Sequence, residues 1–178
     1  PRPVRQACPL PTHPLVHQSA LWLLVSGMLW GQARDKSVNL ATARLVPLAN
    51  SPRKILALGE SGLTPYIQSI GLFRTKAKNV IATCAALLEK FGGEVPHNRE
   101  DLESMPGVGR KTANVVLNTA FGQPTIAVDT HIFRVANRTR TAPGRHVVEA
   151  AKRLLKFVPQ AFLHHAHPCP TLHGAPVR

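Results

Sequence analysis

Cysteine is scarce in this sequence, since the 178 residues contain only Cys8, Cys84 and Cys169. Three thiols give no disulfide framework, which excludes the small secreted scaffolds that depend on several bridges and fits a reducing interior. Cys84 falls within a stripe of apolar residues at helical spacing. We therefore interpret it as a core residue rather than a reactive thiol.

The sequence also lacks an apolar run long enough to cross a membrane. Its most apolar stretch, residues 20–30, is too short for a bilayer and contains Ser26 and Gly27. The first 18 residues contain five prolines and no apolar core, so they do not form a secretory signal. We expect a soluble, intracellular protein that does not bind membranes, cytoplasmic or nucleoid-associated if the source is bacterial.

Acidic residues are few. The chain has 9 Asp and Glu against 22 Lys and Arg, a formal net charge of +13, and its pI is near 10.9. So basic a balance favours a nucleic-acid partner, with anionic membranes and simple solubility as the alternatives.

Strand signals are almost absent, and only residues 125–128 look extended. Apolar residues recur instead at helical spacing, with short connections between the periodic segments. Ser51-Pro52 and Thr64-Pro65 each have the form of an N-cap residue followed by a proline at the first helical position. The pattern predicts an all-α fold, a helical bundle or orthogonal array.

The most informative stretch is residues 105–113, MPGVGRKTA. Asn98 can cap a helix that Pro106 ends, and a second helix begins at Arg110 and stops at Gly122. Glycines at 107 and 109 allow positive φ and close approach of another backbone. The stretch therefore predicts a tight hairpin between two helices.

Such a hairpin exposes backbone N–H groups at a helix N-terminus, beside Arg110 and Lys111. This arrangement binds anions, and on so basic a chain the anion is expected to be a nucleic-acid phosphate. The predicted contact residues are Pro106, Gly107, Val108, Gly109, Arg110 and Thr112.

The hairpin has the form hydrophobic-Pro-Gly-hydrophobic-Gly-x-x-x-Ala, which resembles the helix-hairpin-helix of DNA repair enzymes. From residue 102 to 138 the chain resembles the endonuclease III family, through GVGRKTANVVLNTAFG and PTIAVDTHIFRV. The resemblance implies a bifunctional DNA N-glycosylase that removes oxidised pyrimidines and cleaves the abasic site. It further implies double-stranded DNA with damaged bases or abasic sites as the partner, bound by a monomer.

Lys111 and Asp129 are the candidate catalytic residues. The helix dipole and Arg110 both disfavour a charged ammonium on Lys111, and a neutral amine can attack a sugar C1′ to form a Schiff base. A solvated lysine or a phosphate clamp is the alternative interpretation. Asp129 can cap the helix that follows it. The resemblance implies that Lys111 is the nucleophile and that Asp129 helps to activate it.

Two further candidates concern the extruded nucleotide, whose place in the stack must be filled. Residues 32–39 resemble the family's Gln-Ala-Thr-Asp motif, whose glutamine, here Gln32, enters the gap. The Ile70-Gly71-Leu72 segment resembles the loop with a wedging leucine. Arg34 stands where the family usually has threonine. Other basic residues are either phosphate contacts or solvated surface: Lys76, Lys78, Arg134, Arg138 and Arg140.

The resemblance covers about residues 19–165 and implies three parts. Residues 1–18 would be a Pro-rich, poorly ordered arm, and residues 19–140 a six-helix-type helix-hairpin-helix domain. Residues 141–178 would be a remnant of the second helical domain, which carries the family's cluster, with an irregular His- and Pro-rich tail.

The family's cluster loop, C-x6-C-x2-C-x5-C, holds a four-iron, four-sulfur centre, and these cysteines are absent here. We therefore predict no cofactor. The tail contains the potential metal ligands His164, His165, His167, Cys169 and His173. Their spacing fits no standard zinc pattern and prolines interrupt it, so we predict no metal site.

Two rival interpretations remain open from the sequence. One is a non-catalytic or degenerate helix-hairpin-helix protein that binds DNA without cutting it. The other is a metal-binding protein that uses the His-rich tail.

Overall fold

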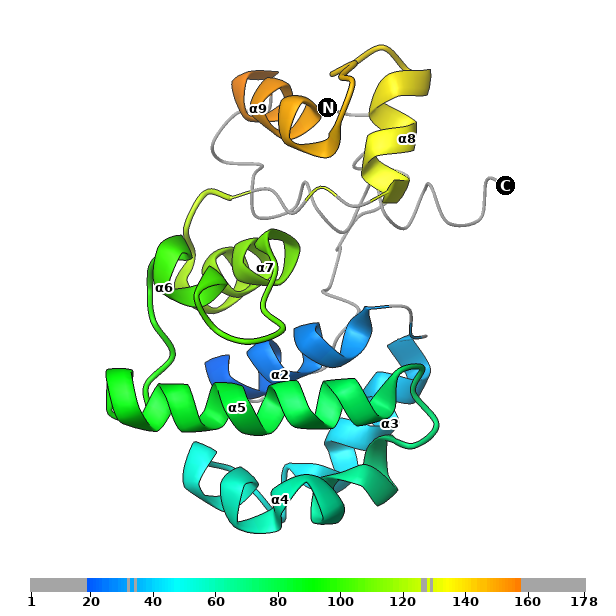
Figure 1. Ribbon diagram of the computed structural model, residues 1–178. Coiled ribbons are helices and arrows are strands. Elements are labelled where there is room, and N and C mark those ends of the chain that lie inside the picture. The colour runs from blue at the N-terminus through cyan, green and yellow to red at the C-terminus, as the bar shows by residue number, and fades with distance from the viewer. Residues whose placement is uncertain (1–18, 32, 34, 126–127, 129, 158–178) are drawn as a thin grey trace. The chain divides into compact units, whose positions relative to one another are not determined.

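A computed structural model describes residues 19–31, 33, 35–125, 128 and 130–157. Over these ranges the regular structure is entirely helical, which confirms the predicted all-α fold (Figure 1). The helices are α2 (Ala20–Trp30), α3 (Asp35–Leu45), α4 (Pro52–Ile67), α5 (Phe73–Phe91), α6 (Arg99–Glu103), α7 (Arg110–Phe121), α8 (Thr130–Arg138) and α9 (Val147–Phe157). None of these helices is long and apolar enough to cross a membrane.

The chain divides into two compact units, and the division falls within α7, after Val116. The first unit contains α2 to α6 and the beginning of α7. The second contains the end of α7 together with α8 and α9. The domain ranges 19–140 and 141–178 stay predictions.

Helix α2 is the buried centre of the first unit. Every residue from Leu21 to Leu29 is buried, as expected for a segment that is apolar on all sides. Ser19 caps it by accepting a hydrogen bond from the N–H of Trp22 at 3.3 Å. Helix α2 packs against α3 and α5, and α4 packs against the same two helices (Figure 1).

Helix α4 confirms one predicted start and contradicts the other. Ser51 caps it by accepting from the N–H of Lys54 at 3.4 Å, with Pro52 at the first position. The helix kinks at Gly59, which has a φ of 66°. Thr64 is not an N-cap, because it lies inside the second segment and its hydroxyl donates to the carbonyl of Glu60 at 2.7 Å. The helical segment starts earlier than Thr64-Pro65, directly after the kink.

Helix α5 carries the buried face that α2 and α4 cover. Cys84 is fully buried on it, and burial raises the pKa of its thiol to about 12. This confirms the core role predicted for Cys84, since a thiol with so high a pKa is scarcely ionised at neutral pH.

Lys76 on α5 is neither a phosphate contact nor solvated surface, so that part of the sequence interpretation is wrong. Only 8% of the residue is exposed. Its Nζ donates to the carbonyl of Leu29 at 2.7 Å and to the carbonyl of Gly31. These carbonyls belong to the C-terminal end of α2, where the helix supplies no donor of its own. Lys76 therefore caps α2 from a neighbouring helix.

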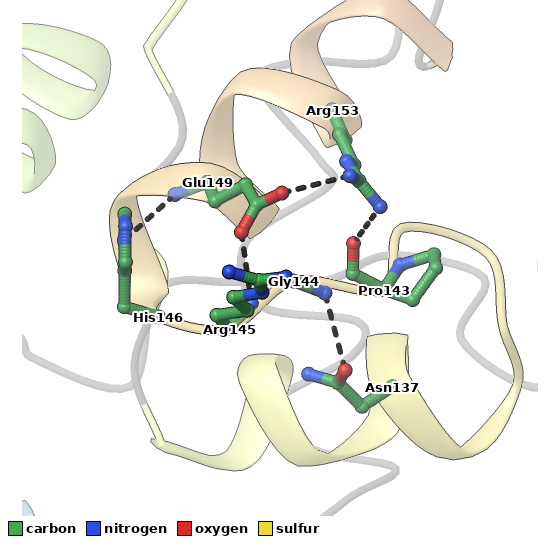
Figure 2. A network of polar contacts seen from close by, with 7 residues as sticks. All are labelled: Asn137, Pro143, Gly144, Arg145, His146, Glu149 and Arg153. Carbon is green, nitrogen blue, oxygen red and sulfur yellow. Dashed lines mark hydrogen bonds and ion pairs between the residues drawn. The ribbon is translucent and has the colours of Figure 1, made fainter.

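In the second unit, Val128 and Ile132 form a small core against the partly buried Phe133, Ala151 and Leu154. Polar contacts join the connecting loop to α8 and α9 (Figure 2). Asn137 accepts from the N–H of Gly144 at 3.1 Å. Glu149 accepts from the N–H of Arg145 at 2.9 Å and pairs with Arg153 at 2.7 Å.

Replacement of Lys76 by methionine should destabilise the protein. The buried carbonyl of Leu29 and the partly buried carbonyl of Gly31 lose their donor, at a cost of about 1–3 kcal/mol in the free energy of unfolding. The control is Lys78→Met, which changes an exposed lysine on the same helix and should cost no more than about 0.5 kcal/mol. Denaturant unfolding of the three proteins measures both values, and equal costs for the two variants would contradict the capping role.

The difference in the free energy of unfolding between the wild type and Lys76→Met should depend on pH. Burial lowers the pKa of Lys76, whereas the unfolded chain holds this proton up to about pH 10.4. Between the folded and unfolded pKa values the unfolded state binds more protons, so the stability of the wild type rises with pH. The neutral amine keeps two N–H donors for the two carbonyls. The stability gap to Lys76→Met should therefore widen on the alkaline side.

Candidate functional site

The predicted hairpin is present between α6 and α7. Asn98 caps α6 by accepting from the N–H of Asp101 at 2.8 Å, which confirms its predicted role. The Arg99 Nε donates to the Asn114 side chain at 3.0 Å and so joins the two helices. Helix α7 ends before Gly122, which has a φ of 64°, as predicted.

The turn of the hairpin is fixed to α5. The buried hydroxyl of Thr83 donates to the carbonyl of Pro106 at 2.8 Å. Gly107 has a φ of 77°, and a Cβ at this position would lie 2.8 Å from the Cβ of Asn79. Both the dihedral and the lack of space therefore require glycine here.

Gly109 differs from Gly107, although the sequence predicts the same role for both. It is not among the described glycines with positive φ. A Cβ at Gly109 would meet nothing within 4 Å. The backbone of Gly109 is therefore open to an approaching molecule, which agrees with close approach but not with a need for positive φ.

The residues predicted to contact a nucleic acid do not all face outward. Pro106, Gly107, Gly109 and Arg110 are exposed, whereas Val108 is buried. The Val108 side chain anchors the turn. The Val108 N–H donates to the carbonyl of Met105 at 3.2 Å.

At the start of α7, the first helical hydrogen bond runs from the N–H of Ala113 to the carbonyl of Gly109 at 3.0 Å. The N–H groups at the start of a helix have no acceptor in a preceding turn and form a partial positive charge. The Arg110 Nε lies 3.4 Å from the Glu103 carboxylate, and the side chain is 54% exposed. A phosphate could therefore meet both the helix start and this guanidinium.

Lys111 is partly buried, and its Nζ lies 3.9 Å from the centroid of the Trp30 ring. Trp30 is the last residue of α2, so the contact joins the end of one helix to the start of another. The sequence did not single out Trp30. Its only local signal is its place directly before Gly31 and Gln32, at the end of an otherwise buried helix.

Thr112 packs against α2 rather than facing outward. A Cβ at Gly27 would lie 2.8 Å from the Thr112 Cγ2, so only glycine lets the helices come this close. Thr112 is partly buried, and its contact with a nucleic acid stays a prediction.

Leu72 is exposed and lies at the start of α5. It is 64% exposed, and its φ of 59° and ψ of 30° are left-handed, which is unusual for a leucine. The structure thus presents a large, exposed apolar side chain at the end of a helix. Its role as a wedge stays a prediction.

Two predicted site residues, Gln32 and Asp129, lie outside the described residues, as does Arg34. Helix α8 begins at Thr130, directly after Asp129, where a helix was predicted to start. Among the remaining basic candidates Lys78, Arg138 and Arg140 are exposed and Arg134 is partly buried. The described ranges contain no group of three or more potential metal ligands, and the His-rich tail lies outside them.

Comparison with known sequences identifies close relatives. Residues 25–160 match the HhH-GPD superfamily of base excision DNA repair proteins. Over 171 residues the chain is 57% identical to endonuclease III of Haemophilus influenzae and 55% identical to that of Escherichia coli K12. Each match covers 96% of this chain and 81% of the relative. The likeness is therefore longer than the expected residues 19–165.

Solved structures give the same result. The fold matches a trapped endonuclease III–DNA covalent intermediate with a TM-score of 0.91 and 39% identity, over 96% of this chain and 81% of that one. It matches a non-covalent endonuclease III–DNA complex with a TM-score of 0.91 and 40% identity, over 96% and 80%. A thermostable thymine-DNA glycosylase shares the fold, with a TM-score of 0.80 at 21% identity over 89% and 75%.

Alanine should lower the stability of the protein at Gly107 and leave it almost unchanged at Gly109. Gly107→Ala combines a left-handed dihedral with a clash against Asn79, and should lower the free energy of unfolding by at least about 2 kcal/mol. Gly109→Ala places its methyl in open space and should change it by less than about 0.5 kcal/mol. Denaturant unfolding measures both. A Gly107→Ala protein as stable as Gly109→Ala would contradict this description of the turn.

Proposed function

The chain belongs to the HhH-GPD superfamily of base excision DNA repair proteins, and on that premise we propose how its residues divide the work of an endonuclease III-type enzyme. It is a DNA glycosylase and abasic-site lyase, and its partner is double-stranded DNA. The observation that carries this conclusion is 57% identity over 96% of the chain to an endonuclease III. A protein that binds DNA without cutting it is not favoured by this likeness.

Lys111 is the nucleophile in this proposal. Its neutral amine attacks C1′ of the damaged nucleotide, and the C1′–N bond breaks as the base leaves with the bonding electrons and takes up a proton. The C1′–O4′ bond then opens, O4′ is protonated, and a protonated Schiff base forms between C1′ and Nζ.

Strand cleavage follows from the Schiff base. Loss of a proton from C2′ moves its electrons toward C1′ and expels the 3′ phosphate as the C3′–O3′ bond breaks. Water then hydrolyses the imine and frees Lys111. The substrate class within this scheme, oxidised pyrimidines, is part of the proposal and rests on the resemblance.

The other site residues are assigned around this reaction. Asp129, directly before α8, helps to activate the Lys111 nucleophile and stabilises positive charge that develops on the sugar. Leu72 enters the stack as a wedge and Gln32 fills the gap left by the extruded nucleotide. The exposed hairpin backbone and Arg110 hold a phosphate beside the lesion.

A four-iron, four-sulfur cluster does not fit the cysteines of these 178 residues. Such a cluster takes four thiolates, whereas the sequence has three cysteines. One of them, Cys84, is fully buried on α5. We assign no step to a cluster.

We further propose that the enzyme acts as a monomer and lies with the DNA inside the cell. If the source is bacterial, this place is the nucleoid.

Replacement of Lys111 by alanine should abolish covalent trapping on DNA. Wild-type protein, incubated with borohydride and a duplex containing one abasic site, should form an adduct stable to denaturing electrophoresis, because borohydride reduces the Schiff base to an amine. Lys111→Ala should form less than about 1% of that adduct, since the nucleophile supplies the whole covalent step.

Lys90→Ala serves as the control, because it removes an exposed lysine from the last turn of α5 and the same positive charge. It should trap DNA as the wild type does. Absence of an adduct with the wild type, alongside salt-sensitive binding to the duplex, would instead support the protein that binds without cutting.

A further inference from the structure

The ring of Trp30 lies beside Lys111 Nζ, an atom whose charge changes during the proposed reaction. We propose that the Trp30 indole stabilises the positive charge of the Schiff base formed at Lys111 Nζ, an inference that rests on the proposed lyase function. The centroid of the ring lies 3.9 Å from Nζ, well within the roughly 6 Å over which a cation is attracted to an aromatic face. Tryptophan is the side chain with the strongest such attraction.

Packing holds this pair in place from both sides. The carbonyls of Leu29 and Gly31, which flank Trp30, both accept hydrogen bonds from the buried Lys76 Nζ. One turn earlier, Gly27 lets α2 approach Thr112, the residue next to Lys111. All of these residues belong to the same compact unit. The backbone that carries the ring is therefore held close to the first turn of α7.

The charge on Nζ decides which intermediates the Trp30 ring stabilises. Nζ is neutral in the attacking amine and in the carbinolamine, and positive in the iminium. When an abasic aldehyde reacts, the carbinolamine C1′–OH bond breaks, the hydroxyl leaves as water with an added proton, and the Nζ lone pair forms the C=N bond. The ring favours the iminium over the neutral carbinolamine before it and the neutral enamine after it.

If the ring stabilises the iminium, weakening the ring should change borohydride trapping and strand cleavage by different factors. A purely structural role of Trp30 would change both by the same factor. Weakening the ring lowers the population of the iminium and therefore the yield of borohydride trapping. It also removes part of the barrier to loss of the C2′ proton, because that step neutralises Nζ. Strand cleavage should fall less than trapping does.

Fluorinated tryptophan tests the charge effect without changing the size of the site greatly. Fluorine on the indole draws electron density from its face, so mono-, di-, tri- and tetrafluorotryptophan weaken cation binding in order. The chain contains two tryptophans, of which Trp22 is buried in the core with 2% exposed. A Trp30→Phe protein labelled in the same way isolates any effect of fluorine at Trp22.

The expected result is a stepwise fall in trapping on an abasic duplex, reaching about three- to tenfold for the tetrafluoro protein. Cleavage of the same duplex should fall less, and binding to a duplex with a tetrahydrofuran abasic analogue should not change. In labelled Trp30→Phe the degree of fluorination should have no effect. Unchanged trapping across the series, or an equal fall in the Trp30→Phe control, would overturn the assignment.

The unlabelled wild type separates failure of this inference from failure of the proposed function. If it traps DNA and the fluorinated proteins trap equally well, Trp30 has no electrostatic role and the lyase stands. If it forms no adduct, both the lyase step and the role of Trp30 are refuted.

Discussion

The close packing of α2 against the first turn of α7 is the constraint on which the site depends. Gly27 leaves no room for a Cβ beside Thr112, so the two helices meet there with almost no space between them. One turn further along α2, the ring of Trp30 lies 3.9 Å from Lys111 Nζ. Lys111, the nucleophile that we propose, is therefore positioned by a helix that is buried along most of its length, and its geometry follows from packing in the core rather than from a loop.

Helix α5 holds both α2 and the hairpin before α7 in place through hydrogen bonds from its side chains. Lys76 donates to carbonyls at the end of α2, and Thr83 donates to the carbonyl of Pro106 in the hairpin. Both donors are buried, and a buried carbonyl without a partner is costly. These bonds fix where α2 ends and where the hairpin turns. The basic charge of the chain thus has two uses, since Lys76 is structural while Arg110 remains at the surface.

Much of the fold could be predicted because its signals are local. The Asn98 cap, the Gly122 stop and the core role of Cys84 follow from residues a few positions apart, and the structure confirms them. Thr64-Pro65 was misread as a helix start, because the kink that precedes it fixes the start instead. Trp30 and Lys76 were missed for a different reason. Their partners lie far away in the sequence, and no local pattern distinguishes a lysine that caps a distant helix from a solvated one. The assignments of Gln32 and Asp129 stay predictions.

The most direct test of the central claim is to locate the covalent bond. Borohydride-trapped enzyme on an abasic duplex, digested with nuclease and trypsin, can be analysed by tandem mass spectrometry. Modification at Lys111 blocks cleavage after that residue, so the sugar remnant should appear on a peptide that runs from Lys111 to Arg134. That result would show that the amine beside Trp30 is the nucleophile. A remnant on any other lysine, with the peptide from Thr112 to Arg134 unmodified and complete, would contradict the account.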